Sequence, residues 1–257
     1  MLGTAPLTFA KGEEPTGTVS ESCNRIKAEW WTDIDTKAPL CEPAEWIIWN
    51  SENTLPTVSG TYILDKDVTL ESAWVIPSGV AITLDLNGHT LKRNLTEAAE
   101  NGYVIATSGN LTILDSSTGK TGTITGGKNI GNGGGIYVSG GTLTMNDVTL
   151  SGNSAINGGG IYVEQNTAAK LNLTDCKIEN NTVSERGSGF CLNSGNAALT
   201  NCQIKNNRSE YYGGGFFVDF TASVSLDGCT VSGNSAKNGG GAFEMEKDGC
   251  VLVVENS

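Results

Sequence analysis

The sequence has little positive charge, no long apolar run and only one histidine. It contains 16 Lys and Arg against 28 Asp and Glu, and its formal charge of −12 argues against a nucleic-acid partner, because phosphate backbones are bound by clustered cations. No apolar run approaches the length of a membrane span. The single histidine, His89, lies in a strand-like alternating segment, and we interpret it as a structural or surface residue. The 257 residues suffice for one domain or one elongated solenoid.

Proline is also scarce, with six residues, whereas glycine is abundant, with 34. The glycines gather in triplets separated by apolar residues, which excludes a flexible linker, and they do not fall at every third position, which excludes collagen. The triplets start at Gly133, Gly158, Gly213 and Gly239, and a degenerate copy, GSG, starts at Gly187. Their spacing of 25 to 29 residues predicts an array of structural repeats.

Each repeat contains three short runs in which apolar and other residues alternate. One repeat shows them at residues 136–138, 143–145 and 148–150. This period of two is typical of strands with one buried face and argues against helical repeats. Three strands and three bends per turn, stacked in register, predict an all-β protein, a parallel β-helix with a triangular section.

Three cysteines occupy one position of the repeat: Cys176, Cys202 and Cys229. Val148 holds the same position one turn earlier, so we interpret the thiols as small, buried, apolar core residues. A zinc site or disulfides are the alternatives, but the column lacks close CxxC pairs and histidine partners, and stacked side chains run parallel instead of facing. Cys23 and Cys41 lie outside the array and are a candidate pair.

An asparagine column follows the third strand of each repeat: Asn153, Asn181, Asn207 and Asn234. Asparagine tolerates left-handed dihedral angles and bonds to its own backbone, so the column is typical of bends. Stacked amides can also pair from turn to turn. The alternative, a ligand site, is not needed to explain the pattern.

The chain divides into three segments. Residues 1–10 resemble the tail of a secretion signal without its basic region, although an ordinary N-terminal segment is the alternative. Residues 11–57 hold four tryptophans and are expected to cap the open end of the solenoid, with a short helix near 43–49; a carbohydrate-binding tryptophan cluster is the alternative. Residues 58–257 form the β-helix, whose early turns are more divergent. Since the last residues, LVVENS, look like part of another repeat, we expect a longer polypeptide.

Two short motifs recur in the repeats. Gly-Gly-Ile occurs at residues 134–136 and 159–161, and an apolar residue stands three positions before each asparagine of the column. This combination resembles the repeats of polymorphic outer-membrane proteins, with the hallmarks GGA(I/L/V) and FxxN. Residues 82–91, ITLDLNGHTL, look like a segment of secreted β-helix proteins of Gram-positive gut bacteria. The resemblance implies a right-handed, pectate-lyase-like β-helix, a secreted or cell-surface location and an adhesin role. The sequence departs from it where Leu, Ile or Val replaces the aromatic residue and where Ser188 interrupts a glycine pair.

The pectate-lyase-like fold also hosts lyases and glycosidases of acidic polysaccharides. Residues 25–27, RIK, match a string of polygalacturonases, but they precede every repeat, so we treat the match as chance; residues 88–90 match only part of a GHG motif. Asp147 and Asp175 share one repeat position, where a weak calcium site is possible and solvated turn acids are the preferred interpretation. No catalytic residue and no other cofactor is predicted, and the lack of long loop insertions argues against an active site.

The middle residues of the first strands are expected to point outward. They form the column Tyr137, Tyr162, Cys191, Phe217 and Phe243. We predict an aromatic ladder that is either covered by another segment or exposed to bind sugars or a partner chain. The sequence therefore favours a non-enzymatic, secreted or cell-surface, adhesin-like β-helix that binds a glycan or a host or bacterial surface protein through a flat strand face. A lyase or glycoside hydrolase of acidic glycans, and a passive stalk in a larger surface protein, are the alternatives.

Overall fold

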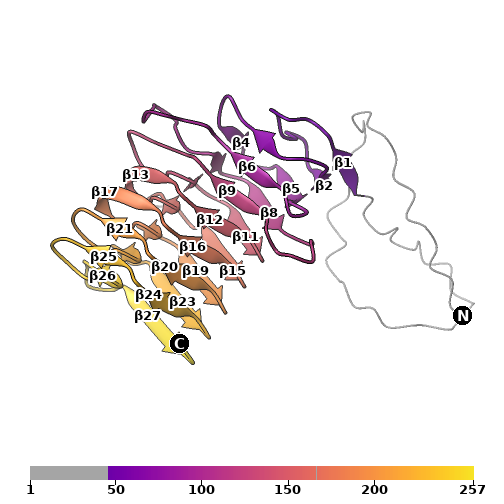
Figure 1. Cartoon of the computed structure of the whole chain (residues 1–257). Helices are drawn as coiled ribbons and strands as arrows, with labels where there is room; N and C mark the ends of the chain where they lie inside the picture. The colour runs from indigo at the N-terminus through magenta and orange to yellow at the C-terminus, as the bar shows by residue number, and fades with distance from the viewer. Residues whose placement is uncertain (1–45, 166) are drawn as a thin grey trace, which may run out of the picture.

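A computed structural model describes residues 46–165 and 167–257 of the chain. The described residues contain 27 strands and no helix, and hence no helix long and apolar enough to cross a membrane. The strands wind into one right-handed coil whose turns succeed one another from β1 at one end to β27 at the other (Figure 1). The predicted parallel β-helix is thus confirmed.

Corresponding strands of successive turns pair side by side in four sheets, and every pairing between them is parallel. The first-strand sheet contains β4 (Trp74–Ile76), β7 (Ile105–Thr107), β10 (Ile136–Val138), β14 (Ile161–Val163), β18 (Phe190–Leu192), β22 (Phe216–Val218) and β26 (Phe243–Met245). The second-strand sheet contains β1 (Ile47–Trp49), β2 (Gly60–Leu64), β5 (Ala81–Asp85), β8 (Asn110–Leu114), β11 (Thr142–Asn146), β15 (Lys170–Thr174), β19 (Asn196–Thr200), β23 (Ser223–Asp227) and β27 (Val251–Glu255).

The remaining two sheets complete each turn. The third-strand sheet contains β3 (Val68–Thr69), β6 (Thr90–Lys92), β9 (Thr123–Thr125), β12 (Thr149–Ser151), β16 (Lys177–Glu179), β20 (Gln203–Lys205) and β24 (Thr230–Ser232). A fourth sheet, which the three-strand repeat did not predict, contains β13 (Ser154–Asn157), β17 (Thr182–Arg186), β21 (Arg208–Ser209) and β25 (Ser235–Ala236). It lies between the asparagine column and the glycine triplets, where the sequence suggested only a bend.

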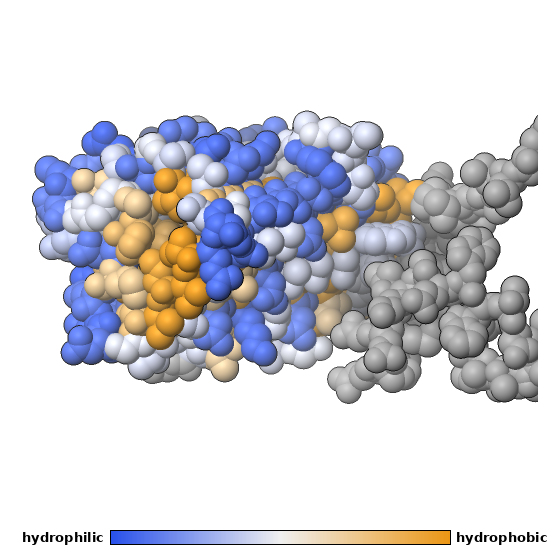
Figure 2. Space-filling view, turned by 90° about the horizontal axis from the view of Figure 1, so that it is seen from below, coloured by the Kyte–Doolittle hydropathy of each residue, from blue (hydrophilic) through white to orange (hydrophobic). Residues whose placement is uncertain are grey.

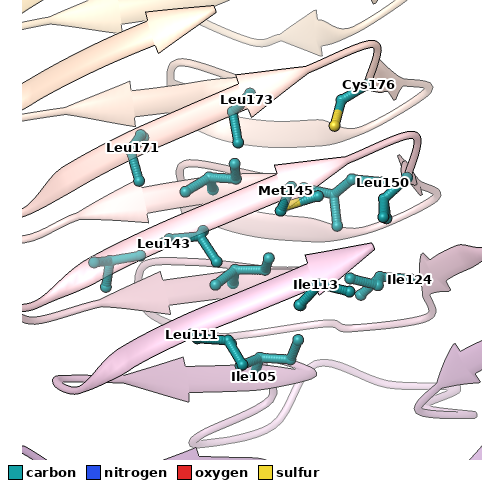
Figure 3. Packing of buried hydrophobic residues seen from close by; sticks show 14 of the residues in the cluster. Ile105, Leu111, Ile113, Ile124, Leu143, Met145, Leu150, Leu171, Leu173 and Cys176 are labelled. Carbon is teal, nitrogen blue, oxygen red and sulfur yellow. The ribbon is translucent and has the colours of Figure 1, made fainter. Parts of the chain in front are cut away.

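The interior of the coil is a continuous stack of apolar side chains (Figure 3). Alternating residues of each strand point inward, as Leu143 and Met145 of β11 do on top of Leu171 and Leu173 of β15. The cysteine column is part of this stack. Cys176, Cys202 and Cys229 are free and buried, as the repeat predicted. The period of two places alternate side chains inside, and the constant turn length stacks each of them on its equivalent in the next turn.

The asparagine column forms a hydrogen-bonded ladder inside the corner. The side-chain N–H of Asn153 donates to Oδ1 of Asn181, and the side-chain N–H of Asn181 donates to Oδ1 of Asn207, at 3.1 Å in both cases. These side chains are fully buried. Pairing from turn to turn is thus confirmed, but the left-handed dihedral angles belong to the preceding residues, such as Asn180 with a φ of 56° and Asn206 with 55°.

The glycine triplets mark a corner where the backbones of adjacent turns approach closely. Gly158 has a φ of +63°, which side chains rarely adopt. A Cβ on Gly160 would lie 2.3 Å from the carbonyl oxygen of Gly189 in the next turn. The triplet therefore combines a left-handed residue with positions that have no room for a side chain.

The beginning of the described chain differs from the sequence-based expectation. Residues 47–49, for which a short helix was predicted, instead form strand β1, which pairs with β2 in the second-strand sheet. The early alternating segments are strands of regular turns, as expected. The predicted signal remnant, most of the cap and the candidate pair Cys23 and Cys41 lie outside the described residues.

Candidate functional site

The outward face of the first-strand sheet carries the predicted column of middle residues. The register aligns Tyr137 with Tyr162, Tyr162 with Cys191, and Cys191 with Phe217. Ala106 precedes Tyr137 in this column and Glu244 follows Phe217. Val75 of β4 precedes Ala106, so the column runs from two aliphatic side chains through aromatic rings, interrupted by Cys191, to a carboxylate.

The prediction that Phe243 belongs to this outward column is wrong. Phe243 pairs with Phe216, and its ring stacks on that of Phe216 with centroids 5.2 Å apart, in line with the inward-pointing Phe190. One additional residue, Ala242, stands between the third glycine of the last triplet and the strand. Because side chains alternate along a strand, this single residue moves Phe243 to the opposite face.

Three tyrosine rings lie against one another along the outward face. The ring of Tyr137 stacks on Tyr103 and on Tyr162, with centroids 5.6 Å apart in both pairs and interplanar angles of 22° and 17°. Tyr103 precedes β7 and lies outside the register column, so the sequence did not suggest it. Since the rings pair face to face, only their edges and hydroxyls, and the two end faces of the stack, remain for a ligand.

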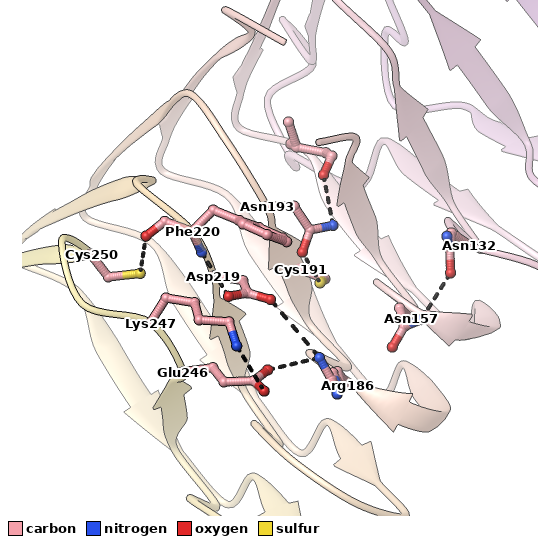
Figure 4. Close-up of polar contacts among 11 residues, drawn as sticks. Asn132, Asn157, Arg186, Cys191, Asn193, Asp219, Phe220, Glu246, Lys247 and Cys250 are labelled. Atoms are coloured by element: carbon pink, nitrogen blue, oxygen red, sulfur yellow. Dashed lines mark hydrogen bonds and ion pairs between the residues drawn. The ribbon is translucent and has the colours of Figure 1, made fainter. Parts of the chain in front are cut away.

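Phe217 lies in the outward column as predicted, and of the two alternatives, covered or exposed, its ring is covered. Only 1% of Phe217 is accessible, because the guanidinium of Arg186 lies over its ring, 5.1 Å from the centroid. Arg186 is held in place by Glu246, with an N–O distance of 2.8 Å, and lies 4.0 Å from Asp219 (Figure 4). Arg186 comes from β17, so the cover over Phe217 is a side chain of the fourth sheet.

Two hollows open on this face, one at each end of the tyrosine stack. The first has a volume of about 480 Å³ and the second about 290 Å³. The first is lined by Glu100, Asn101, Tyr103, Asn129, Ile130, Gly131, Asn132 and Tyr137. The second is lined by Asn157, Tyr162, Gln165, Glu185, Arg186, Cys191, Asn193, Asp219 and Phe220. We call the outward face from Tyr103 to Phe217, with both hollows, the trough.

The second hollow has a floor and two flanks. Tyr162 and Cys191 form its floor, on β14 and β18. One flank consists of residues from β13 and β17 that precede the floor in each turn, and the other consists of loop residues that follow it, including Asn193 and Asp219. The asparagine pair Asn132 and Asn157 runs along the first flank, with a hydrogen bond of 2.9 Å between the two side chains (Figure 4).

The hydroxyls and the thiol of the trough stay protonated. Burial, together with a hydrogen bond to Glu164, raises the pKa of Tyr137. Burial, with smaller contributions from Cys191 and Glu164, raises the pKa of Tyr162 to about 12. Burial also raises the pKa of the Cys191 thiol, although Arg186 acts in the opposite direction. The floor therefore presents neutral groups, while its charge comes from the carboxylates and Arg186 on the flanks.

A third hollow, of about 260 Å³, lies on the outer face of the second-strand sheet. It is lined in part by Ala198, Val251 and Val253, and the two valines are exposed. Figure 2 shows an apolar patch on one side of the coil. Because the hollow has fewer polar groups that could orient a ligand, the trough is the stronger candidate site.

The calcium candidates lie elsewhere, at a bend. Asp147 and Asp175 both have left-handed backbone angles, with φ values of 60° and 53°, and Asn201 continues the column with 53°. The carboxylate of Asp147 lies 3.2 Å from the ammonium of Lys120. No group of three or more potential metal ligands occurs among residues 46–165 and 167–257. The acids thus have a structural explanation in the turn, and calcium at this bend stays a prediction.

Residues 134–257 match the family model of the right handed beta helix region. The matched part runs through the regular repeats to β27 and contains the second hollow and Tyr137 of the stack. No curated protein and no solved structure matches the chain. The match concerns the fold of this β-helix and identifies no functional site.

The sequence identified the floor of the trough but not its flanks. Tyr137 and Tyr162 lie where the column predicted them, whereas Asn157, Glu185 and Arg186 were not singled out. The last residue before each glycine triplet or its degenerate copy is a signal that could have indicated this flank, because Asn132, Asn157 and Arg186 all stand there.

Proposed function

We propose that this β-helix binds a glycan along the trough, without catalysis, as a secreted or cell-surface protein. The observation that carries the proposal is the tyrosine stack with a polar hollow at each end. Ligand sites combine apolar surface with a few polar groups that fix orientation, and the trough has both. The secreted or surface location is supported by the resemblance of the repeats.

The trough suits a chain-like ligand. Successive turns rise by about 4.8 Å, so the three steps from the turn of Tyr103 to that of Cys191 cover roughly 14 Å. Hydroxyl, amide and carboxylate groups repeat along this length, and each can donate or accept a hydrogen bond from a sugar hydroxyl. A sugar ring can lie against the free face of Tyr103 or Tyr162, but not between the stacked rings.

The proposal is tested with a glycan array followed by calorimetric titration of the strongest ligand. Tyr162→Ala removes the ring at the edge of the second hollow and should weaken binding at least about tenfold, because it removes the stacking surface. Thr230→Ala is the control, since Thr230 is exposed on the third-strand sheet and lines none of the three hollows. Equal affinities of both variants and the parent protein would show that the trough does not bind the glycan. If no glycan binds at all, a passive stalk would be favoured.

One observation favours a second candidate function, glycoside hydrolysis. Glu185 and Asp219 line the second hollow from opposite flanks, and glycoside hydrolases act with two carboxylates across the scissile bond. A reducing-end assay on the glycans that bind distinguishes the two functions. Product formation that is abolished by Glu185→Gln would establish an enzyme, and intact glycan after prolonged incubation would favour binding alone.

A further inference from the structure

The aromatic column of the trough is interrupted at Cys191. Tyr162 precedes it by one turn and Phe217 follows by one turn, and both of these side chains are rings. Because a thiol is far smaller than a phenyl ring, the second hollow opens where a ring would otherwise stand. One face of Tyr162 is occupied by Tyr137, so its other face is turned towards this hollow, which we call the Cys191 slot.

The only guanidinium in the Cys191 slot is already neutralised. Arg186 has Glu246 at 2.8 Å and Asp219 at 4.0 Å, and Lys247 approaches Glu246 at 3.8 Å. Glu185 is exposed in the slot and has no ion pair or side-chain hydrogen bond among the described residues. An additional carboxylate from an acidic sugar would therefore meet net negative charge, and a cation would be attracted.

A second group in the slot lacks a hydrogen-bond donor. Oδ1 of Asn157 is buried and has no partner within the described residues, while the amide nitrogen of the same side chain donates to Asn132. A buried acceptor without a donor is costly, so a ligand that supplies an N–H or O–H group gains from filling this position. An ammonium group carries three donors and a positive charge, which match Asn157 and Glu185 together.

We propose that the Cys191 slot binds an amino-sugar unit of the glycan, with its ring against Tyr162 and its ammonium group near Glu185 and Asn157. This assignment rests on the proposed glycan-binding function and gives it a ligand class: cationic amino sugars instead of acidic polysaccharides. Tyr162 supplies the apolar surface, and the flank residues supply the acceptors.

The test compares three oligosaccharides of equal length by calorimetric titration: a glucosamine oligomer, its N-acetylated form and an oligogalacturonate. The glucosamine oligomer should bind roughly two- to fivefold more tightly than the N-acetylated one, the range for one partly exposed ion pair. The difference should shrink at about 0.5 M NaCl, because salt screens exposed charges. The galacturonate should bind most weakly.

Two variants and their controls locate the effect. Glu185→Gln should abolish the preference for the free amine but keep the binding of the N-acetylated oligomer, whereas Glu179→Gln, on the third-strand sheet, should change neither. Cys191→Phe should fill the slot and weaken binding of both oligomers, whereas Cys191→Ala should preserve it.

The outcomes separate the two claims. If both oligomers bind through Tyr162 with equal affinity, or if the galacturonate binds best, glycan binding stands and the amino-sugar assignment is overturned. If none of the three binds while other glycans do, the assignment is likewise overturned. If no glycan binds at all, both claims fall. Retention of the amine preference in Glu185→Gln would also contradict the assignment.

Discussion

The turns before and after residue 132 build the same coil with different corner chemistry. In the later turns, the asparagine ladder and the glycine triplets close two of the corners, and both repeat visibly in the sequence. In the earlier turns, buried aspartates satisfy backbone N–H groups at a different bend, the one after the second strand, where Asp147 stands in the next turn. Asp115 accepts hydrogen bonds from the backbone N–H groups of Gly88, Ser117 and Gly122. Asp85 accepts from those of Asn87 and Ser116.

The comparison shows that parallel pairing carries the fold, while each corner only has to satisfy its backbone groups. Strands of the early and late turns pair in one continuous register, as between β8 and β11. Buried N–H groups need acceptors wherever the chain bends, and aspartates, asparagines and neighbouring carbonyls all supply them in this coil. Sequence repeats therefore reveal only the later turns, in which the same corner residues recur from turn to turn.

The largest loss of stability is expected from a substitution that breaks the asparagine ladder of the later turns. Oδ1 of Asn181 accepts from the backbone and side-chain nitrogens of Asn153, and its amide donates to Leu150 and Asn207. Asn181→Ala leaves these buried groups without partners and should lower the free energy of unfolding by about 4 kcal/mol, since each orphaned group costs about 1–3 kcal/mol. Urea unfolding followed by circular dichroism measures it.

The control for the ladder is the exposed Asn172, whose replacement by Ala should change stability by less than about 0.5 kcal/mol. If Asn181→Ala were as stable as this control, the later corners would not depend on the ladder, and the contrast between the two halves would disappear.

A somewhat smaller effect is expected at the glycine corner. Gly160→Ala places a Cβ 2.3 Å from the carbonyl oxygen of Gly189, and the backbone must shift, at a cost of about 3 kcal/mol. Gly119→Ala, in the early turns, is the matched control, because its Cβ would meet only Thr121 at an ordinary 3.4 Å. The same unfolding experiment compares the two variants; similar midpoints would mean that the close approach at Gly160 is relieved without cost.

The aspartate corner of the early turns predicts a dependence on pH. Burial raises the pKa of Asp115, but the hydrogen bonds led by that of Gly122 outweigh it, and the pKa is lowered overall. A lowered pKa stabilises the fold above the unfolded value of about 4, and this stability is lost as the pH falls through the folded pKa. Asp115→Asn leaves the N–H of Gly122 without its acceptor and should cost about 2 kcal/mol at neutral pH.

Stability measured from pH 7 down to about pH 3 checks the sign. The difference in the free energy of unfolding between the parent protein and Asp115→Asn should narrow at acid pH. The parent protein loses the stabilisation from the Asp115 carboxylate as it is protonated, and the variant has no such carboxylate. A difference that stays constant with pH would mean that Asp115 acts through its shape and not through its charge.

The sequence predicted those features that repeat with the period of the coil. The three strands per turn, the buried thiols such as Cys176 and the asparagine column follow from residues that recur at one position. Likewise, Tyr137 and Tyr162 were expected on the outward face, and they lie there. In each case a local pattern is enough, because the neighbour in space is the equivalent residue one turn away.

Features that depend on a single residue or on side chains from another strand were missed. Ala242 lengthens one corner and reverses the face of Phe243, a change that the triplet spacing hides. The cover of Phe217 by Arg186, and the participation of Tyr103 in the stack, depend on how side chains reach across strands. The character of the trough is set by these exceptions, so its flanks could not be read from the repeat.

The smallest expected effect tests whether the buried thiols are only core atoms. Cys202 is inaccessible, and Val148 occupies its position two turns earlier. Cys202→Val should therefore change stability by less than about 1 kcal/mol, since it is a small apolar exchange. Cys202→Ser should cost more, about 1–2 kcal/mol, because it buries a hydroxyl. The carbonyl oxygen of Leu173 lies 3.4 Å from the sulfur of Cys202, which is long for a hydrogen bond from a hydroxyl. If Cys202→Val were less stable than Cys202→Ser, the thiol column would have a role beyond packing.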